Sequence, residues 1–277
     1  MSKKSGKYAY VNGVKCTQGW SSSVSSSLSR YYASCVAGAS GVTPGNKDET
    51  GSFKGLGFAP PLPDGHVFDF KGVVSVSPIL NWVGNVYITD VTLNIPVAAG
   101  GPINWTANFG ADGLLTKDTS TAYEDASVDA APSAKYGQVQ IETAEGVWTA
   151  VDRPQNIVLT FRAPAATSVN SGVTEREGGN LEVDITVDVH NDMRDVAMYE
   201  PNVVKRVRVY VSATEFFEFA NITWGGKTNF NVDRSSNPPA IIGYTINGMW
   251  GALSEGSTSL GYIKLPDDTY LFGEAPA

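Results

Sequence analysis

One short segment of the chain, VDITVDVHND at 183–192, holds the side chains best suited to chemistry. Its polar members Asp184, Asp188, His190 and Asp192 occur at even spacing, so an extended strand would project all four from one face. Carboxylate and imidazole groups gathered in this way can hold a divalent cation. Any half-buried strand shows the same alternation, with valine and isoleucine toward the core and a solvated polar face outside. We favour this second interpretation, which leaves the four residues as weak candidates for a metal site.

No catalytic constellation accompanies this segment. The chain has 2 histidines, and it contains no G-x-S-x-G nucleophile elbow, phosphate-binding loop, dinucleotide fingerprint or H-E-x-x-H pair. Neither Cys16 nor Cys35 is flanked by a family signature that marks a nucleophile. The sequence therefore predicts a protein that is not an enzyme and that holds no cofactor.

A basic segment, KRVRV at 205–209, offers a different kind of interaction. On a strand, Arg206 and Arg208 share one face, and Lys205 lies on the other. The two arginines would either pair with acidic side chains of a neighbouring subunit or remain solvated. The sequence does not decide between these alternatives.

The formal net charge of −8 limits the partners of the chain. Phosphate binding needs clustered lysine and arginine, so an acidic chain is a poor candidate for gripping nucleic acid. The charge is uneven, because residues 1–133 carry 9 basic and 10 acidic side chains, a net charge of −1, whereas residues 134–277 carry 11 and 18, a net charge of −7. We therefore expect a protein that can work beside DNA without binding it.

The cysteines and the N-terminus indicate the compartment. Two cysteines in 277 residues do not make a disulfide framework, so we expect Cys16 and Cys35 to be reduced thiols, with a single bridge as the alternative. The basic N-terminus has no apolar run behind it, and no stretch approaches the ~20 apolar residues of a membrane helix. These features predict a soluble protein that is made in a cytoplasm and has no membrane partner.

The elements that must position these residues are strands. Val, Ile, Thr, Ser and Tyr alternate with 29 glycines and 15 prolines, and no long stretch shows helical spacing, so the chain is predicted to be all-β. We expect strands at 67–77, 85–91, 92–97 and 103–110, and a terminal hairpin around 266–268. A long ordered loop is expected at 41–66, with a short strand near Phe53. The serine-rich segment 20–30 fits either a strand or a flexible loop.

The second half of the chain repeats the order of motifs in the first half. INWTANFGADGL at 103–114 aligns without a gap with IGYTINGMWGAL at 242–253, so Thr106 meets Thr245 and Asn108 meets Asn247 at an offset of 139 (247 − 108). Earlier matches, namely GVT, GN, VSVSP with VYVSA, and LNI with FNV, have offsets of 131, 134, 135 and 137 in chain order. Chance matches would scatter, whereas a duplicated unit that gained loop residues would drift steadily. We therefore predict two homologous domains, 1–133 with a polar linker at 115–135, and 134–277 with a C-terminal extension.

The order of motifs also fits a known pattern. It runs through YYASCVAGASGVTPGNKDETGSFKGLGFAP and PDGHVFDFKG, then through YVSATEFFEFANITW, NFNVD, IIGYTINGMWGAL and GYIKLPDDTYLF. In this order the chain resembles the tail tube proteins of long-tailed bacteriophages, although the serine-rich segment 20–30 and the TEREGG segment depart from the pattern. The resemblance implies a β-sandwich-like or half-barrel fold in each repeat. It also implies that sheets of neighbouring subunits join into a ring-shaped β-barrel around a channel.

The same resemblance implies what the protein does. It would be a structural virion protein, assembled in the host cytoplasm, whose stacked rings form the hollow phage tail tube through which DNA is ejected. Other tail proteins would bind at the ends of the tube, and DNA would pass through the lumen without specific binding. Because a chain with two repeats does the work of two subunits, we expect a trimeric pseudo-hexamer rather than a hexameric ring. The alternative function is a two-domain β-sandwich module that binds a glycan or a receptor.

Overall fold

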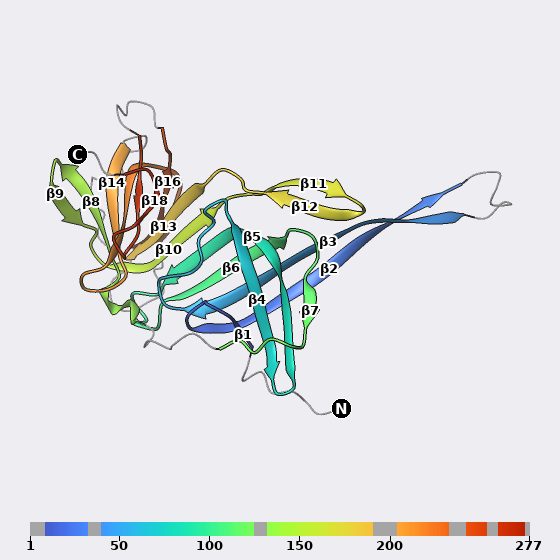
Figure 1. Ribbon diagram of the computed structural model, residues 1–277. Coiled ribbons are helices and arrows are strands. Elements are labelled where there is room, and N and C mark those ends of the chain that lie inside the picture. Colours follow the sequence, from blue (N-terminus) through green and yellow to red (C-terminus); the bar gives the residue numbers. More distant parts are fainter. Residues whose placement is uncertain are drawn as a thin grey trace.

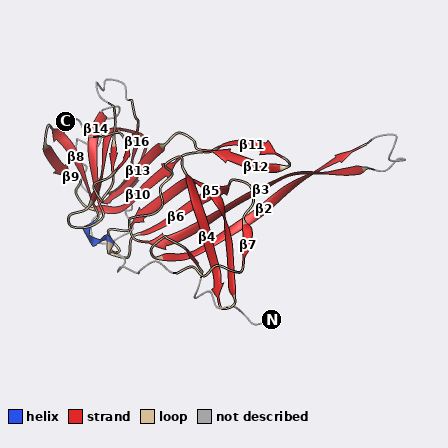
Figure 2. Ribbon diagram, in the orientation of Figure 1, coloured by secondary structure: helices blue, strands red, loops and turns tan. Residues whose placement is uncertain are grey.

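The computed structural model describes residues 9–32, 40–124, 132–190, 204–232, 242–253 and 260–274. Strands dominate this part of the chain, which has one short 3-10 helix, η3 (Ala134–Tyr136), as Figure 2 shows. The all-β prediction is therefore confirmed. The strands form one large sheet, which the single molecule does not close into a barrel.

Antiparallel strands of the first half lie side by side in the order β2–β3–β6–β5–β4–β1, with β7 beside the first part of β5. Their bounds are β1 (Tyr10–Val11), β2 (Thr17–Tyr31), β3 (Gly41–Leu56), β4 (Val67–Val76), β5 (Ile79–Ile95), β6 (Asn104–Ala111) and β7 (Thr116–Asp118). Residues 97–100 form the turn that the sequence predicts between β5 and β6.

The second half has the same strand order, β10–β13–β16–β15–β14–β8, with β17 beside the first part of β15. Two short strands, β9 and β18, add an edge to β8 and β17. The bounds are β8 (Gln138–Ala144), β9 (Val147–Ala150), β10 (Pro154–Arg162), β11 (Ala166–Asn170), β12 (Val173–Glu177), β13 (Glu182–His190), β14 (Val204–Tyr210), β15 (Phe216–Val232), β16 (Ile242–Trp250), β17 (Ile263–Lys264) and β18 (Tyr270–Phe272). The β17–β18 pair is the terminal hairpin expected around 266–268.

The register of these strands agrees with the sequence alignment of the two halves. Phe53 lies opposite Ala107 and Trp20, whereas Val187 lies opposite Ile246 and Ile157. The offset is therefore 134 between β3 and β13 (187 − 53), 137 between β2 and β10 (157 − 20), and 139 between β6 and β16 (246 − 107). The first and last of these values are those of the GN match and of the INWTANFGADGL match, so sequence and topology pair the same positions there. The GVT match, with its offset of 131, is out of register with the strands.

The two halves are joined strand to strand. The second part of β5 pairs with β10 from Ile95 opposite Ile157 to Asp90 opposite Arg162, and β10 pairs with β13 on its other side. Leu93 and Leu159 lie opposite each other at this joint and are fully buried. Burying a leucine side chain contributes about 1.5–3 kcal/mol, so the joint is a strong apolar contact.

Each half packs aromatic side chains under its sheet. Phe53 contacts Phe70, Phe109 and Trp105 in the first half, with ring centroids 5.8–6.1 Å apart, and Phe161 contacts Phe217 at 5.8 Å in the second. These rings belong to one continuous core cluster of the described residues. Sheet strands alternate accordingly, with buried apolar side chains on one face and polar side chains on the other.

Two sequence predictions about strand lengths are wrong. The expected loop at 41–66 is, for its first 16 residues, the strand β3. Its glycines do not mark turns: a Cβ on Gly51 or on Gly55 would come within 2.3 Å of the Phe109 or Trp105 ring, so glycine makes room for aromatic packing. The strands expected at 85–91 and 92–97 are one strand, β5, in which an irregular register between Ile88 and Asp90 shifts the alternation.

Two other sequence predictions concern the segments beside these strands. The serine-rich segment is the strand β2 and not a flexible loop. The predicted linker 115–135 contains β7 and part of η3, and its residues 125–131 lie outside the described ranges.

Both halves extend one hairpin beyond the sheet. In the first half the distal parts of β2 and β3 form a long arm, and in the second half β11 and β12 form a shorter arm. Figure 1 shows the short arm lying alongside the base of the long one, where Val173 of β12 pairs in parallel with Lys47 of β3. Tyr31 lies opposite Gly41 in the long arm, and Ser168 lies opposite Glu175 in the short one, again at offsets of 137 (168 − 31) and 134 (175 − 41).

Candidate functional site

The four metal candidates lie on or after β13, and the structure gives two of them partners within the protein. Asp184 forms an ion pair with Arg162 of β10, and Asp188 Oδ1 accepts a hydrogen bond of 2.6 Å from Thr245 Oγ1. The side chain of His190 and the whole of Asp192 fall outside the described residues. Within the described part of the chain, no three His, Cys, Asp or Glu side chains gather closely enough to hold a metal ion. The acids of β13 thus belong to the polar face of the sheet.

Arg206 and Arg208 share one face of β14, as the sequence predicts, but both contact acids of their own chain. Arg206 donates to Glu142 Oε1 (3.0 Å) and to Glu218 Oε1 (2.7 Å), while Arg208 donates to Glu218 Oε2 (2.7 Å). The sequence left two alternatives open for these arginines, namely pairing with a neighbouring subunit or solvation. The structure shows a third arrangement. The arginines are paired within the subunit.

Glu218 lies at the centre of this cluster with only 6% of its side chain exposed. Burial favours its neutral form, but hydrogen bonds from Tyr262, Arg206 and Arg208 outweigh burial and lower the pKa of Glu218. Burial and the hydrogen bond to Glu218 raise the pKa of Tyr262, which keeps the Tyr262 hydroxyl protonated as a donor. The Arg208 guanidinium also lies 3.9 Å from the centre of the Trp148 ring. The cluster joins Glu142 of β8, Trp148 of β9 and Tyr262 before β17 to the neighbouring strands β14 and β15, so its role is to stabilise the fold. We call it the charged lock.

Two long strand edges have no strand beside them in the described part of the chain, in addition to the outer edges of the short strands β1, β7, β9, β11 and β18. β2 pairs with β3 on one side only, along its length from Thr17 to Tyr31. β15 has β14 and β17 beside its first part, but from residue 225 to Val232 it pairs with β16 alone. Unpaired backbone N–H and C=O groups in such edges favour the addition of another strand.

The counterparts of these two edges pair with each other inside the molecule. β10 takes the place of β2, and the second part of β5 takes the place of the second part of β15, and these two form the joint between the halves. One molecule therefore contains one completed joint and, at the opposite sides of its sheet, the two edges from which a second joint of the same kind can be built.

The short arm is fixed to the first half by Arg176, which has 7% of its side chain exposed. Its guanidinium donates to the Ala111 carbonyl (2.6 Å) and to Asp48 Oδ1 (2.6 Å). A Cβ on Gly110 would come within 2.2 Å of Arg176 Nε, so glycine at this position lets the arginine lie on the sheet. The Lys47 N–H adds a backbone hydrogen bond of 2.9 Å to the Gly172 carbonyl. The arm is thus held by charge and by backbone contacts together.

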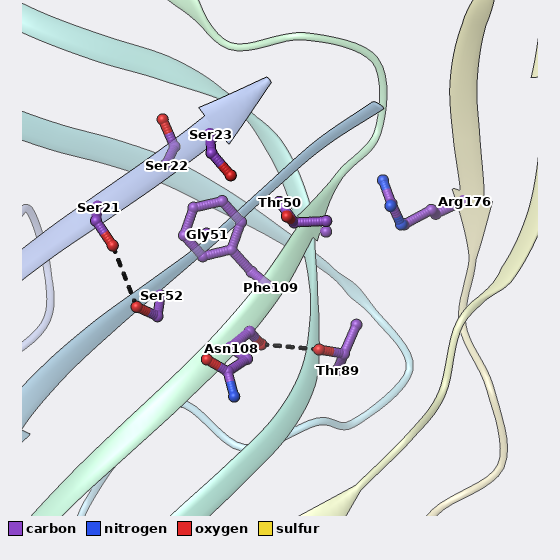
Figure 3. A pocket seen from close by; sticks show the side chains of 11 residues that line it. Ser21, Ser22, Ser23, Thr50, Gly51, Ser52, Thr89, Asn108, Phe109 and Arg176 are labelled. Carbon is purple, nitrogen blue, oxygen red and sulfur yellow. Dashed lines mark hydrogen bonds between the residues drawn. The ribbon is translucent and has the colours of Figure 1, made fainter. Parts of the chain in front are cut away.

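A shallow depression lies between this arm and β2, as Figure 3 shows. Ser21 Oγ and Ser52 Oγ lie 3.3 Å apart, Thr89 Oγ1 donates to the Asn108 carbonyl (3.2 Å), and Arg176 reaches in from β12. Its lining residues include no histidine, cysteine or carboxylate, so the serines have no base beside them. The depression is a polar surface without the groups of a catalytic site.

Sequence reasoning missed Arg176 and Glu218. Arg176 lies in the TEREGG segment, which departs from the pattern of the resembled family. The offset of 134 from the GN match nevertheless aligns Arg176 with Val42 of the long arm (176 − 42). Glu218 gave no signal, because a single acid in the aromatic run EFFEFA does not indicate burial. Cys35 lies outside the described residues, so the redox state of Cys16 and Cys35 stays a prediction.

Comparisons with known proteins add no family to these observations. No family model matches the sequence, and no curated protein matches it. In the described ranges, no helix is long and apolar enough to cross a membrane. Functional inference for this chain therefore rests on its strand edges, its two arms and the polar face of its sheet.

Proposed function

We propose that this protein is a structural subunit that joins edge to edge with copies of itself into closed rings, and that the rings stack into the tail tube of a bacteriophage. The protein would then belong to the virion and would assemble in the host cytoplasm, with other tail proteins at the tube ends. The observation that carries the proposal is the pair of unpaired edges on β2 and β15, whose counterparts already form a joint within the chain.

The geometry of the internal joint supports a head-to-tail contact between copies. β2 and β15 are different surfaces, so each copy offers one edge and receives the other. A heterologous contact of this kind generates a ring when the rotation closes. Closure pairs the two long edges of β2 and β15, which reduces the aggregation hazard of an open sheet.

The internal joint also supplies a register for the contact between copies. Thr160 lies opposite Thr92 in the joint. Their counterparts, both at an offset of 137, are Ser23 on β2 (160 − 23) and Asn229 on β15 (229 − 92). Ser23 of one copy would therefore lie opposite Asn229 of the next.

The number of chains per ring follows from the repeat. If the contact between copies has the geometry of the internal joint, each chain contributes two equivalent joints to the ring. One lies within the chain and the other lies between the chain and its neighbour. Tubes of the resembled kind have six such joints in a ring, so three chains suffice. We therefore propose a trimeric pseudo-hexamer, with a six-chain ring as the alternative.

The polar face of the sheet suits a wall beside DNA. On this face β3, β5, β10 and β13 carry more acids than bases, including Asp90, Glu182, Asp184 and Asp188 against Lys54 and Arg162. Neutral polar groups are added by Thr106, Asn108, Thr245 and Asn247. Because carboxylates outnumber cations there, the face repels phosphate more than it binds it. This supports passage of DNA through a lumen without specific binding.

The alternative, a glycan-binding module, has less support in the described residues. A sugar platform needs exposed aromatic rings. Trp105 and Trp224 are buried and Trp250 is 8% exposed, whereas Trp82 is 36% exposed and Tyr32, Tyr136 and Tyr270 are exposed as well. The three buried tryptophans contribute apolar area to the core instead.

Disulfide trapping tests the joint and the ring size together. In a background with Cys16→Ser and Cys35→Ser, the pair Ser23→Cys and Asn229→Cys should form disulfides between copies under mild oxidation, because directly opposed positions on paired strands suit a disulfide. A non-reducing gel should show dimers and trimers, with no species above three chains. Negative-stain images of the same sample should show hollow rings.

A mismatched pair provides the control. Ser23→Cys with Asn231→Cys is displaced by two positions along the strand and should cross-link poorly, because diagonal neighbours lie about 7–8 Å apart. Cross-linked species of up to six chains on the gel would contradict the trimeric ring and support the hexameric ring. A protein that stays monomeric at high concentration and forms no cross-link with either pair would contradict the proposed function.

A further inference from the structure

The contact that fixes the short arm inside one molecule has an unfilled counterpart on the second half. Arg176 of the short arm binds Asp48 on β3 of the first half. At the offset of 134 between β3 and β13, Asp48 corresponds to Glu182 (182 − 48), which is exposed. No ion pair of the described residues involves Glu182: Arg162 lies directly opposite it on β10 but pairs with Asp184, whereas the counterpart Asp48 has an almost buried guanidinium on it.

The long arm carries an arginine at the matching place. Arg30 of β2 lies directly opposite Val42 of β3, and Thr167 of β11 lies directly opposite Arg176 of β12. These pairs correspond at offsets of 137 (167 − 30) and 134 (176 − 42), so both arms hold one arginine in the same cross-strand pair, on different strands. Directly opposed residues project to the same face of a hairpin, and an arginine side chain can span the ~5 Å between paired strands. Arg30 is exposed and, like Glu182, belongs to no ion pair of the described residues.

Exposed apolar side chains surround the counterpart site. Met249 is 62% exposed and Leu253 is 76% exposed. At the offset of 139 between β6 and β16 they correspond to Gly110, against which Arg176 packs, and to Leu114, which is partly buried beside Arg176 and Val173 under the short arm. These two side chains are exposed, whereas the counterpart positions Gly110 and Leu114 lie against the short arm. A second long arm would cover them as the short arm covers Leu114.

We propose that Arg30 on the long arm of one copy binds Glu182 on β13 of the next copy, as Arg176 binds Asp48 within the chain. This proposal rests on the ring proposed above and names the partner of the long arm as a second copy of this chain. The two contacts are not identical, because Met249 stands where Gly110 makes room for Arg176. The Met249 side chain would keep the Arg30 guanidinium farther from the sheet than Arg176 lies above Gly110. Glutamate is one methylene longer than aspartate, so the Glu182 carboxylate can reach that greater distance.

A charge-reversal cycle tests this contact in the full chain. Arg30→Glu and Glu182→Arg should each raise the protein concentration for half-maximal ring formation by about tenfold or more, because like charges then face each other across the joint. The double variant should return to within about threefold of the unchanged protein, since the pair is restored in reverse. Lys117→Glu, a charge reversal of an exposed side chain on β7, is the matched control and should leave assembly unchanged. Sedimentation velocity measures assembly, and the melting temperature of the monomer confirms folding of each variant.

The outcomes separate this contact from the ring itself. Rings of the unchanged protein together with unaltered assembly of Arg30→Glu would overturn the contact and leave the proposed function standing. Loss of assembly in both single variants without recovery in the double variant would also overturn the pairing, because the two charges would then act independently. Absence of rings from the unchanged protein at every concentration would instead overturn the proposed function, and this contact with it.

Discussion

The two halves of the molecule share one strand order, yet their equivalent edge strands carry different side chains. β10 brings Leu159 to the joint, where it is fully buried, whereas the counterpart position on β2 is Ser22, which is exposed. A buried joint can use apolar area, whereas a small polar side chain suits an exposed position on an edge, although the apolar Val24 and Leu28 of β2 are exposed as well. The difference teaches that equivalent strands of the two halves keep the same backbone pairing while their side chains follow the burial of each strand.

The halves also differ in the polar residue that each buries. Asn81 lies opposite Val73 as Glu218 lies opposite Arg208, and both side chains are buried. Asn81 donates to the Thr121 carbonyl (2.7 Å), and Glu218 accepts from Tyr262, so each anchors the chain segment near its closing strand. The first half does this with a neutral amide and the second half with a carboxylate, so the Glu218 contact depends on pH whereas the Asn81 contact does not.

The largest effect should come from truncating the internal joint. Leu159→Ala should lower the free energy of unfolding by about 3 kcal/mol, because it removes apolar contacts and leaves a cavity against Leu93 and Ile185. The counterpart change, Ser22→Ala, should alter it by less than about 0.5 kcal/mol in the monomer, as is usual for exposed positions. Urea unfolding at low protein concentration measures both. Equal effects at the two positions would mean that β2 is already covered in the isolated molecule.

The charged lock should give the next largest effect. Glu218→Gln should lower the free energy of unfolding at pH 7 by about 2 kcal/mol, a value below that of a fully buried ion pair because Arg206 and Arg208 remain partly exposed.

The same variant tests the pH dependence of the second half. The pKa of Glu218 is lowered on folding, so its contribution is complete above the unfolded value of about 4.3 and is lost as the pH falls through the folded pKa. Unfolding followed between pH 6 and pH 3 should therefore show a steeper loss of stability for the unchanged protein than for Glu218→Gln. Parallel pH profiles would contradict the assignment of this pH dependence to Glu218.

The sequence predicted the all-β class and the strand alternation of β13, because alternation of valine with polar residues is a local property. It failed at β3, since glycines that accommodate aromatic rings look the same in sequence as glycines in turns. It could not find Arg176 and Asp48, which lie 128 residues apart and meet only when the short arm folds over the first half. The order of the aligned motifs indicated which positions are equivalent, but the partner of each residue depends on contacts between the halves.

Removing Arg176 should loosen one arm and leave the other unchanged. Arg176→Ala should cost about 1.5 kcal/mol, because Asp48 keeps partial access to water and only the Ala111 carbonyl is left buried without this donor. Hydrogen exchange should quicken in β11 and β12, whereas β13 should keep its protection. Arg30→Ala is the matched change in the long arm and should leave the stability of the monomer within about 0.5 kcal/mol. Faster exchange throughout both halves would show that Arg176 stabilises the joint and not merely the arm.

The smallest effect should distinguish the two threonines that the repeat shares. Thr245 donates to Asp188 at 2.6 Å, whereas Thr106 lies between Lys54 on β3 and Thr92 on β5, neither of which offers a carboxylate. Thr245→Val should therefore cost about 1 kcal/mol through the lost hydrogen bond to a carboxylate, and Thr106→Val should be close to neutral, because valine also suits a strand. Thermal unfolding of the two variants side by side measures the difference, and Asp188→Asn should reduce it by weakening the acceptor. Equal costs at both positions would show that the shared threonines serve the common backbone architecture and not their different neighbours.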